Sequence, residues 1–302
     1  MSQPSTAEHL TLKPYAALGL AVASASVSAI LIRLADAPPL VIGFWRLTFA
    51  SLLLTPFALW LAGNELQHLP RRDLRLALVS GAFLGLHFAT WITSLEYTSV
   101  ASSVVLVTTA PIFVGLASPL FWRVKLGRGV WLGIFLSIAG GVIISFGDMR
   151  LVGRALLGDL LALLGAMAIS AYFLIGRQLR RRLSLLAYVL PTYWMAAVVL
   201  ALAAWLADDS FVGHTGPTWL MLLLLAIFPQ IMGHSLMNWS LRHVSPTMVT
   251  VSNLAEPIFA TILAYFVLAE TPTPVKAIGG VLVLVGIYVT MQGERQQEAP
   301  RA

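Results

Sequence analysis

Two charged side chains lie inside long apolar segments of this sequence. Glu256 is near the middle of the apolar run 246–268, and Arg46 is six residues inside the run 40–61. A charge at the centre of a bilayer costs at least about 2.5 kcal/mol on insertion scales, so each should face a cavity or a partner. Glu256 either binds a substrate amine, carries a proton, or is a hydrogen-bonded structural acid. Arg46 either snorkels to the outer surface or pairs structurally, or it meets a substrate carboxylate.

Polar side chains also recur at helical spacing within two other apolar segments. His87 and Trp91 are one helical turn apart, and Gln230, His234 and Asn238 form a similar stripe in the second half of the chain. A polar stripe in lipid must point inward. We therefore predict that both stripes line one cavity. The alternative is interhelical hydrogen bonding, which contributes about 0.6 kcal/mol per contact.

Two prolines occupy matched positions within apolar segments. Pro111 and Pro257 each remove one helix hydrogen bond and free the carbonyl four residues back, which belongs to Val107 and to Asn253 respectively. Paired interruptions in corresponding helices are the best sequence pointer to a transporter's binding site. The alternative is a pair of simple kinks whose backbone groups are satisfied by neighbouring Ser or Thr.

Several aromatic residues within the apolar segments could stack on a substrate, although helix packing alone also explains such residues. They are Tyr172, Tyr193, Trp194 and Tyr265. Glycine pairs at small-xxx-small spacing, Gly81 with Gly85 and Gly129 with Gly133, predict close helix packing.

Signatures of an enzyme are weak in this sequence. It has no cysteine, and its six histidines lack metal-ligand spacing, so we expect no metal and no cofactor. The segment Gly233-His-Ser-Leu-Met237 approaches a nucleophile elbow but lacks the final glycine. Hydrolysis there would need a general base beside Ser235, for which His87 is the plausible candidate. We therefore do not expect an enzyme. No P-loop is present either, so active transport would have to draw on an ion gradient or on the substrate's own gradient.

The elements that must position these residues follow from composition. The chain of 302 residues is 58% apolar and only 11% charged, whereas soluble domains carry about 25% charged residues. Its net charge of +6 lies in short loops between apolar runs, a pattern that argues against nucleic-acid binding. About 20 mostly apolar residues cross a bilayer as a helix. We predict an all-α integral membrane protein with ten transmembrane helices at 14–34, 40–61, 74–95, 99–122, 129–147, 158–176, 184–206, 218–238, 246–268 and 275–292.

Lysines and arginines gather on one face of the predicted bundle. The larger set comprises Lys13, Arg71, Arg72, Arg75, Arg123, Lys125, Arg128, Arg177, Arg180, Arg181, Arg182, Arg242, Arg295 and Arg301, and the opposite set comprises Arg33, Arg150, Arg154 and Lys276. The positive-inside rule then puts both termini, with the tails 1–13 and 293–302, in the cytoplasm. The even number of spans agrees with that placement.

The two halves of the chain resemble each other. At an offset of 146 residues, Pro111–Ile112–Phe113 matches Pro257–Ile258–Phe259. The predicted repeats, 14–147 and 158–292, each hold five spans, and an odd number means that the second repeat enters the membrane upside down. Inverted repeats are typical of secondary transporters, because two similar halves can rock about a central site. The alternative is a duplication with a purely structural role.

One segment carries a family resemblance. The residues Asn253-Leu-Ala-Glu-Pro-Ile-Phe-Ala-Thr-Ile-Leu-Ala-Tyr-Phe-Val-Leu-Ala-Glu270, followed by Gly279-Gly280 and Gly286, resemble the EamA-type domain of the drug/metabolite transporter superfamily. The resemblance covers nearly the whole chain as two tandem domains. The first half departs from the pattern, because Trp122-Arg-Val-Lys125 stands where an acidic residue is usual.

The resemblance implies a ten-helix 5+5 transporter of a bacterial inner membrane, with the fifth and tenth helices outside the central cavity. Within the family the chain looks most like the YddG-type exporters of amino acids. We expect a secondary exporter of neutral or aromatic amino acids that works by alternating access. Export of drug-like cations or other metabolites, and a facilitator or channel, are the alternatives. The expected partners are the substrate and the lipid bilayer, with proton coupling left open and the protein a monomer or weak homodimer.

Overall fold

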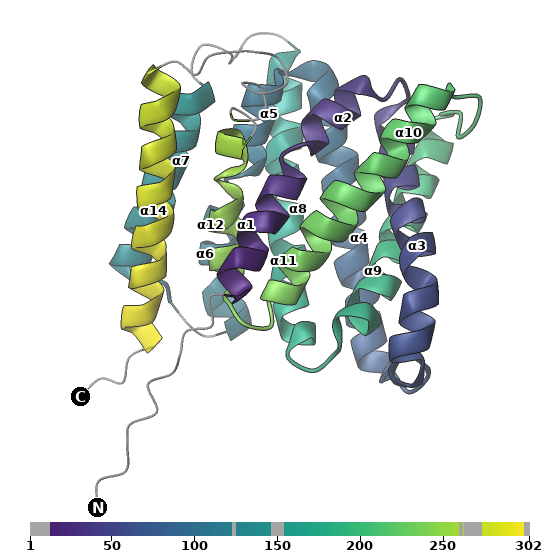
Figure 1. The fold of residues 1–302 in the computed structure, drawn as a ribbon, viewed down its shortest axis with the longest axis horizontal. Coiled ribbons are helices and arrows are strands. Elements are labelled where there is room, and N and C mark those ends of the chain that lie inside the picture. Colours follow the sequence, from purple (N-terminus) through teal and green to yellow (C-terminus); the bar gives the residue numbers. More distant parts are fainter. Residues whose placement is uncertain (1–12, 123–124, 146–153, 260–261, 263–273, 299–302) are drawn as a thin grey trace, which may run out of the picture.

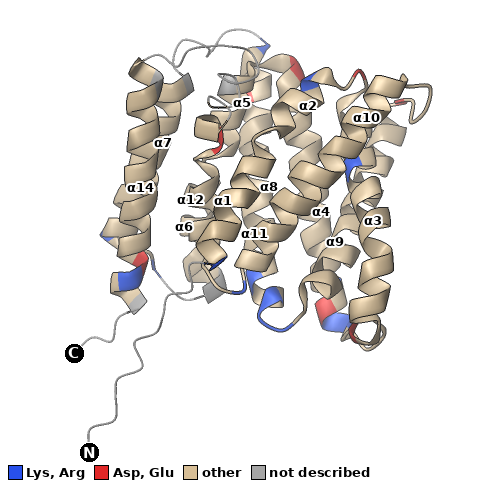
Figure 2. Ribbon diagram, viewed as in Figure 1, with Lys and Arg blue, Asp and Glu red and all other residues tan. Residues whose placement is uncertain are grey.

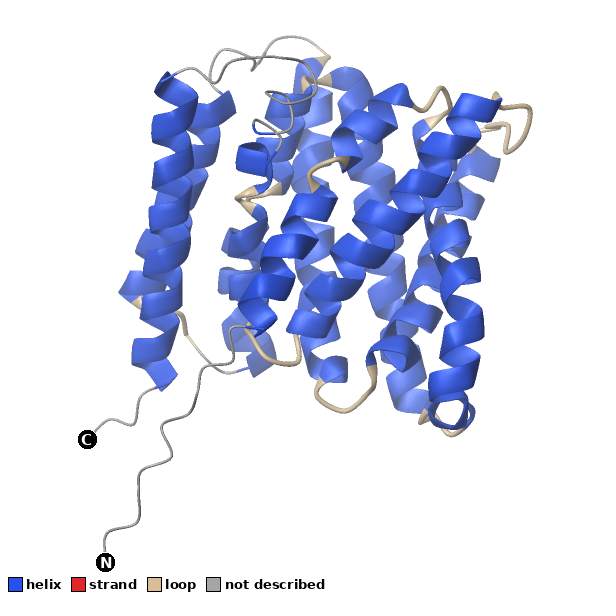
Figure 3. Cartoon of the chain, viewed as in Figure 1, coloured by secondary structure: helices blue, strands red, loops and turns tan. Residues whose placement is uncertain are grey.

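The computed structural model describes the chain except for residues 1–12, 123–124, 146–153, 260–261, 263–273 and 299–302. Every regular element among the described residues is a helix (Figure 3). In chain order they are α1 (Lys13–Ala25), α2 (Ser28–Leu34), α3 (Pro39–Gln67), α4 (Arg71–Tyr97), α5 (Val100–Val107), α6 (Ala110–Trp122), α7 (Arg128–Ser145), α8 (Ala155–Arg180), α9 (Leu185–Leu206), α10 (Gly216–Leu225), the π-helix η1 (Ala226–His234), α11 (Ser235–Ser240), α12 (Pro246–Asn253) and α14 (Pro274–Glu298).

Many of these helices are long and apolar enough to cross a bilayer. Within the described residues eight stretches qualify: Lys13–Leu34, Pro39–Gln67, Arg71–Tyr97, Ser102–Leu120, Ala155–Arg180, Leu185–Leu206, Gly216–Ser240 and Ala277–Gln297. A shorter apolar helix, Arg128–Ile144, occupies the predicted span 129–147. The predicted span 246–268 lies partly outside the described residues. The prediction of apolar helices long enough to span a membrane is therefore confirmed for the described residues, and the count of ten spans stays a prediction.

Charged residues lie mainly at the two ends of the bundle, and its middle is almost free of them (Figure 2). The first described residue of α1 and the last turn of α14 lie at the same end, which we call the termini end (Figure 1). This arrangement requires an even number of crossings. The compartment that the termini end faces stays a prediction.

Three helices are interrupted in the interior. The first span breaks at Ser26–Val27, the fourth breaks at Thr108–Thr109, and α12 ends at Asn253 (Figure 1). Pro111 and Pro257 follow the last two breaks by a few residues, where the missing N–H groups prevent continuous helix hydrogen bonding. The predicted interruptions are thus present. The first break has no proline and was not expected.

A fourth irregularity is the π-helix η1, which joins α10 to α11 without a break in direction. It contains Pro229, whose missing N–H favours a local shift in the hydrogen-bond pattern. π-Helical turns occur frequently at functional sites because they re-aim side chains.

Helices α7 and α14 pack side by side at one edge of the bundle (Figure 1). A Cβ atom added to Gly133 would lie 2.3 Å from Thr290 Oγ1, and one added to Gly286 would lie 2.2 Å from Ser137 Oγ. Only glycine permits this approach of two backbones. The close-packing interpretation of the glycine spacing therefore applies to Gly133, and also to Gly81, whose added Cβ would lie 2.4 Å from the Thr192 carbonyl oxygen.

Candidate functional site

The interrupted helices converge on one cavity in the interior, of about 50 Å³. Ala25 and Ser28 flank the first break, Thr108 lies at the second, and Asn253 and Glu256 flank the third; all five line the cavity. The π-helix contributes Pro229 and His234, and the continuous helices contribute Arg46, His87 and Trp91. Backbone that leaves regular helix inside a membrane is tolerated where it lines such a cavity.

Arg46 is fixed inside the bundle. Its side chain is 1% exposed, Nε donates to Gln230 Oε1 at 2.9 Å, and Nη1 donates to Ser28 Oγ at 2.9 Å. The guanidinium also lies over the Phe88 ring, 4.1 Å from its centroid. The snorkelling alternative is therefore wrong, because three interior partners hold the side chain away from the surface.

Glu256 lies directly after the third break. It lines the same cavity as Arg46, and it also lines a second cavity of about 70 Å³ between the first turn of α2 and α5. Both residues are described, and no ion pair joins them. The cavity thus holds a buried guanidinium and a half-buried carboxylate that are not directly paired with each other.

The two predicted polar stripes meet at this cavity. The rings of His87 and Trp91 are stacked at 5.8 Å, and the rings of His87 and His234 are 6.4 Å apart. His87 Nδ1 is 3.0 Å from the Gly165 carbonyl oxygen, which can only accept. The proton of a neutral His87 ring therefore lies on Nδ1, and Nε2 is left as an acceptor.

Other predicted residues stand behind the lining. Gln230 holds Arg46, and Asn238 Nδ2 donates to the His234 carbonyl oxygen at 2.7 Å and to the Tyr172 hydroxyl. Tyr193 Oη is 3.0 Å from Ser235 Oγ in the same layer. These side chains fix the orientation of the lining residues, and Tyr172 does not itself line the cavity.

Not every predicted residue reaches the site. Trp194 lies on α9 with 36% of its surface exposed and does not line the cavity. Tyr265 lies outside the described residues. Pro111 and Pro257 adjoin the lining residues Ala110 and Glu256.

Sequence reasoning missed the small lining residues Ser28, Thr108 and Thr250. Serine and threonine are common in helices that pack closely in membranes, so their type alone carries no signal.

Several buried polar atoms of the site have no hydrogen-bond partner within the described part of the chain. On the lining these are Trp91 Nε1, His234 Nδ1 and Asn253 Oδ1, and behind it Gln230 Nε2 and Asn238 Oδ1. Buried polar groups are nearly always paired in folded proteins. Donors and acceptors of this kind suit a polar ligand that offers both.

Ser235 shows no catalytic arrangement. Its hydroxyl bonds to Tyr193 Oη and, at 3.4 Å, to the Gln230 carbonyl oxygen, while His87 Nδ1 bonds to Gly165. A serine nucleophile needs a base within hydrogen-bond reach. The described contacts therefore assign Ser235 to the polar layer behind the cavity.

The end opposite the termini holds a larger open basin of about 690 Å³. Arg33, Asp36, Glu96, Asp209 and His214 line it. Partial burial, and then the neighbouring Asp208 carboxylate, raise the pKa of Asp209 above its usual value. The basin is polar and wide, whereas the cavity beneath it is narrow.

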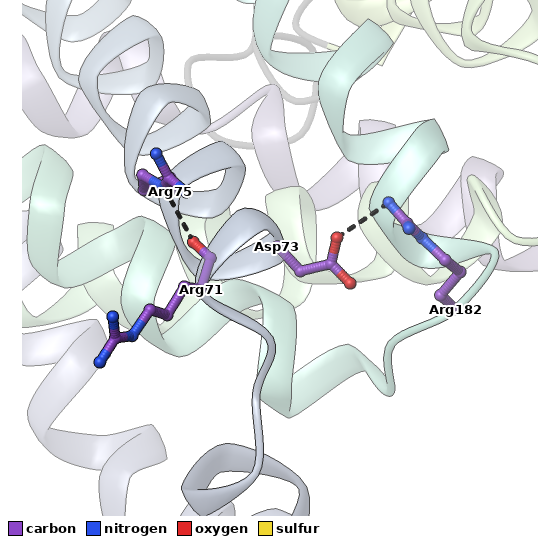
Figure 4. A network of polar contacts seen from close by, with 4 residues as sticks. All are labelled: Arg71, Asp73, Arg75 and Arg182. Atoms are coloured by element: carbon purple, nitrogen blue, oxygen red, sulfur yellow. Dashed lines mark hydrogen bonds and ion pairs between the residues drawn. The ribbon is translucent and has the colours of Figure 1, made fainter.

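The termini end is tied together by polar contacts. Arg182 Nη2 forms an ion pair with Asp73 Oδ1 at 2.9 Å, beside the bond from Arg75 Nε to the Arg71 carbonyl oxygen (Figure 4). Glu65 Oε1 accepts from the Ser184 backbone N–H at 2.8 Å. The ion pair and the Glu65 hydrogen bond link α4 and α3 to the loop between α8 and α9.

Comparison with known proteins gives a family and a fold. The model of the EamA-like transporter family matches residues 13–146 and 156–292. An uncharacterized transporter of Archaeoglobus fulgidus is 26% identical, with 93% of this chain and 97% of that protein aligned. The uncharacterized inner membrane transporter YedA of Escherichia coli is 28% identical, with 84% and 82% aligned. A crystal structure with 19% identity superposes with a TM-score of 0.77 over 95% of this chain and 99% of the other, which shows a shared fold.

Proposed function

Because this chain belongs to the EamA-like transporter family, we propose that it is a secondary transporter that exports neutral or aromatic amino acids across a bacterial inner membrane. The relatives are described as transporters, and one of them as an inner membrane transporter. Membership of this family shows that the chain is a membrane transporter. The substrate class, the direction and the mechanism are the proposal.

The observation that carries the substrate proposal is the pair of opposite charges in one cavity. Arg46 suits an α-carboxylate, because a guanidinium binds carboxylates through paired N–H donors. Glu256 suits an α-ammonium group. An amino-acid zwitterion supplies both counter-charges at once, whereas a simple cation or anion would leave one of the two charges without its partner.

The side chain of the substrate would meet an aromatic wall. The stacked rings of His87 and Trp91 and the unpaired Trp91 Nε1 adjoin the two charges. Aromatic rings stack favourably in offset or edge-on arrangements. These rings favour a substrate with a neutral or aromatic side chain over a substrate with a charged one.

The size of the cavity supports alternating access. Small-molecule sites usually measure about 300–1,000 Å³, far more than the about 50 Å³ of this cavity. The site must therefore widen to admit a substrate. Two family matches in one chain support two repeats of five spans that rock about the breaks.

The test is efflux from liposomes that contain the purified protein. Vesicles would be loaded with single amino acids, and efflux followed with and without an imposed pH gradient. We expect saturable efflux of neutral or aromatic amino acids, and the response to the pH gradient would separate antiport from facilitated diffusion. Efflux of organic cations without any amino-acid efflux would favour the drug-like cation alternative.

A further inference from the structure

A buried carboxylate lies apart from the central cavity. Asp159 is in the second turn of α8 and is 5% exposed. Its Oδ1 accepts from Thr98 Oγ1 at 2.9 Å and from Ser102 Oγ at 3.1 Å. Its Oδ2 is buried and has no hydrogen-bond partner among the described residues. One oxygen of the carboxylate is therefore satisfied, and the other is not.

Three membrane spans meet at this carboxylate. Thr98 is the residue at which α4 ends, and Ser102 is in the first turn of α5. A Cβ atom added to Gly158, next to Asp159, would lie 2.8 Å from the Thr98 backbone nitrogen and 3.0 Å from the Ser94 carbonyl oxygen. α8 is thus pressed against the carboxyl-terminal end of α4, where helix carbonyl groups carry partial negative charge.

No described cation neutralises Asp159. Among the described residues, the other charged ones at this end of α4, α5 and α8 are Glu96 on α4 and Arg154 before α8, and both are exposed. Arg154 lies over the Tyr97 ring, 5.6 Å from its centroid, and makes no ion pair with Asp159. A buried charge requires a partner. The carboxylate and the carboxyl-terminal end of α4 favour a positive charge here, and the two hydroxyl oxygens keep lone pairs that a cation can use.

We propose that Asp159, Thr98 and Ser102 form a binding site for a monovalent metal cation, Na⁺. Na⁺ is a hard cation that prefers oxygen ligands, and the carboxylate and the two hydroxyls supply them. The bound cation pairs with a charge that no described residue neutralises, and it strengthens the junction of α4, α5 and α8.

The site gives the transporter a point of coupling. The junction lies at the end opposite the termini, where the substrate must enter or leave (Figure 1). This coupling role rests on the proposed transport function. Cation binding itself does not, because it is measured without substrate.

The experiment is thermal unfolding of the full-length protein in detergent, without substrate. Unfolding would be followed in NaCl, KCl and choline chloride at equal ionic strength and at one pH. A rise in Tm of several degrees specific to Na⁺ would support the sodium site. The same Tm in the three salts would overturn it.

Variants separate this site from other carboxylates. Asp159→Asn is expected to abolish the Na⁺ response, and Glu96→Gln, which removes an exposed carboxylate of α4, is expected to keep it. If Asp159→Asn does not fold, Thr98→Val and Ser102→Ala are expected to weaken the Na⁺ response several-fold. Equal Na⁺ responses in the wild type and in all three site variants would overturn the proposal.

Discussion

At the residue scale, the protein places two opposite charges in one cavity without pairing them. Arg46 has three interior partners, all neutral, and Glu256 lies across the break that follows α12. Neutral partners hold the guanidinium in position and leave its charge available. This arrangement suits recognition of a charged group more than structural pairing, because a structural pair would place the two charges in contact.

Replacement of Arg46 by Gln should weaken binding of the substrate carboxylate. Hydrogen bonds to charged groups contribute about 1.5–3 kcal/mol, so we expect a loss of roughly tenfold to a hundredfold in apparent affinity. The measurement is the concentration dependence of efflux from liposomes. Arg33→Gln, which removes an exposed arginine of the outer basin, is the matched control and should keep the wild-type affinity. An unchanged affinity in Arg46→Gln would show that the carboxylate binds elsewhere.

Replacement of Glu256 by Gln should remove the preference for an amine. The wild-type protein should transport an amino acid far better than the carboxylic acid that lacks its amino group. With that analogue, the Glu256 carboxylate has no ammonium group to pair with, and it repels the carboxylate of the analogue. Glu256→Gln should transport the two compounds with similar efficiency, while Glu96→Gln at the exposed end of α4 should still discriminate. Competition between the two compounds measures this directly. If Glu256→Gln keeps full discrimination and pH dependence, the residue is neither the amine site nor the proton carrier.

At the element scale, broken and unbroken helices have separate tasks. The three breaks and the π-helix surround the cavity, whereas α7 and α14 are continuous, pack on each other and contribute no lining residue. Irregular helices let backbone groups and side chains approach a ligand. Continuous helices with glycine contacts provide a rigid support at the edge of the bundle.

Gly133→Ala should destabilise the α7–α14 pair. The new Cβ would meet the Thr290 backbone nitrogen at 2.5 Å and the Gly286 carbonyl oxygen at 2.6 Å, and backbone atoms cannot easily yield. We expect a loss of about 1–3 kcal/mol, as for overpacked cores. Gly141→Ala, which meets nothing within 4 Å, should be neutral or slightly stabilising. Thermal unfolding in detergent measures both, and equal stability of the two variants would contradict the packing argument.

At the scale of the whole molecule, the two ends of the bundle differ. The Asp73–Arg182 ion pair and the Glu65–Ser184 hydrogen bond join helices at the termini end, and the opposite end holds an open basin above a narrow cavity. In the alternating-access cycle that we propose, the two ends open in turn, so the contacts at the termini end would have to break. The Arg182 side chain of this ion pair is 44% exposed. Ion pairs that are exposed to water contribute little to stability, so this one can open at low cost.

Asp73→Asn should increase the population that is open at the termini end. The natural chain has no cysteine, so a single Ser80→Cys substitution in the buried layer gives labelling without background. A membrane-impermeant thiol reagent would be applied from the termini side to two proteins, Ser80→Cys alone and Ser80→Cys combined with Asp73→Asn. We expect the reagent to modify the double variant several-fold faster than the single variant. Arg75→Gln, at an exposed site nearby, should not change the rate. Equal labelling rates would show that the ion pair does not hold this end closed.

The sequence by itself determined the features that depend on local chemistry. The length of each apolar segment predicted the helical spans, because the thickness of the bilayer sets the length of a spanning helix. Pro111 and Pro257 predicted the ends of α5 and α12, because a missing N–H interrupts the helix that contains it. The stripe spacing of His87 with Trp91 likewise predicted a shared face.

Only the tertiary structure decided which faces meet. Arg46 bonds to Gln230, 184 residues away in the chain, and no local pattern specifies that contact. Trp194 lies on a helix that is apolar on all sides, so periodicity could not separate its lipid face from its buried face. In a membrane the lipid is as apolar as the core, and the hydrophobic pattern that orients helices in water is therefore lost. Packing of helices far apart in the chain supplies that information instead.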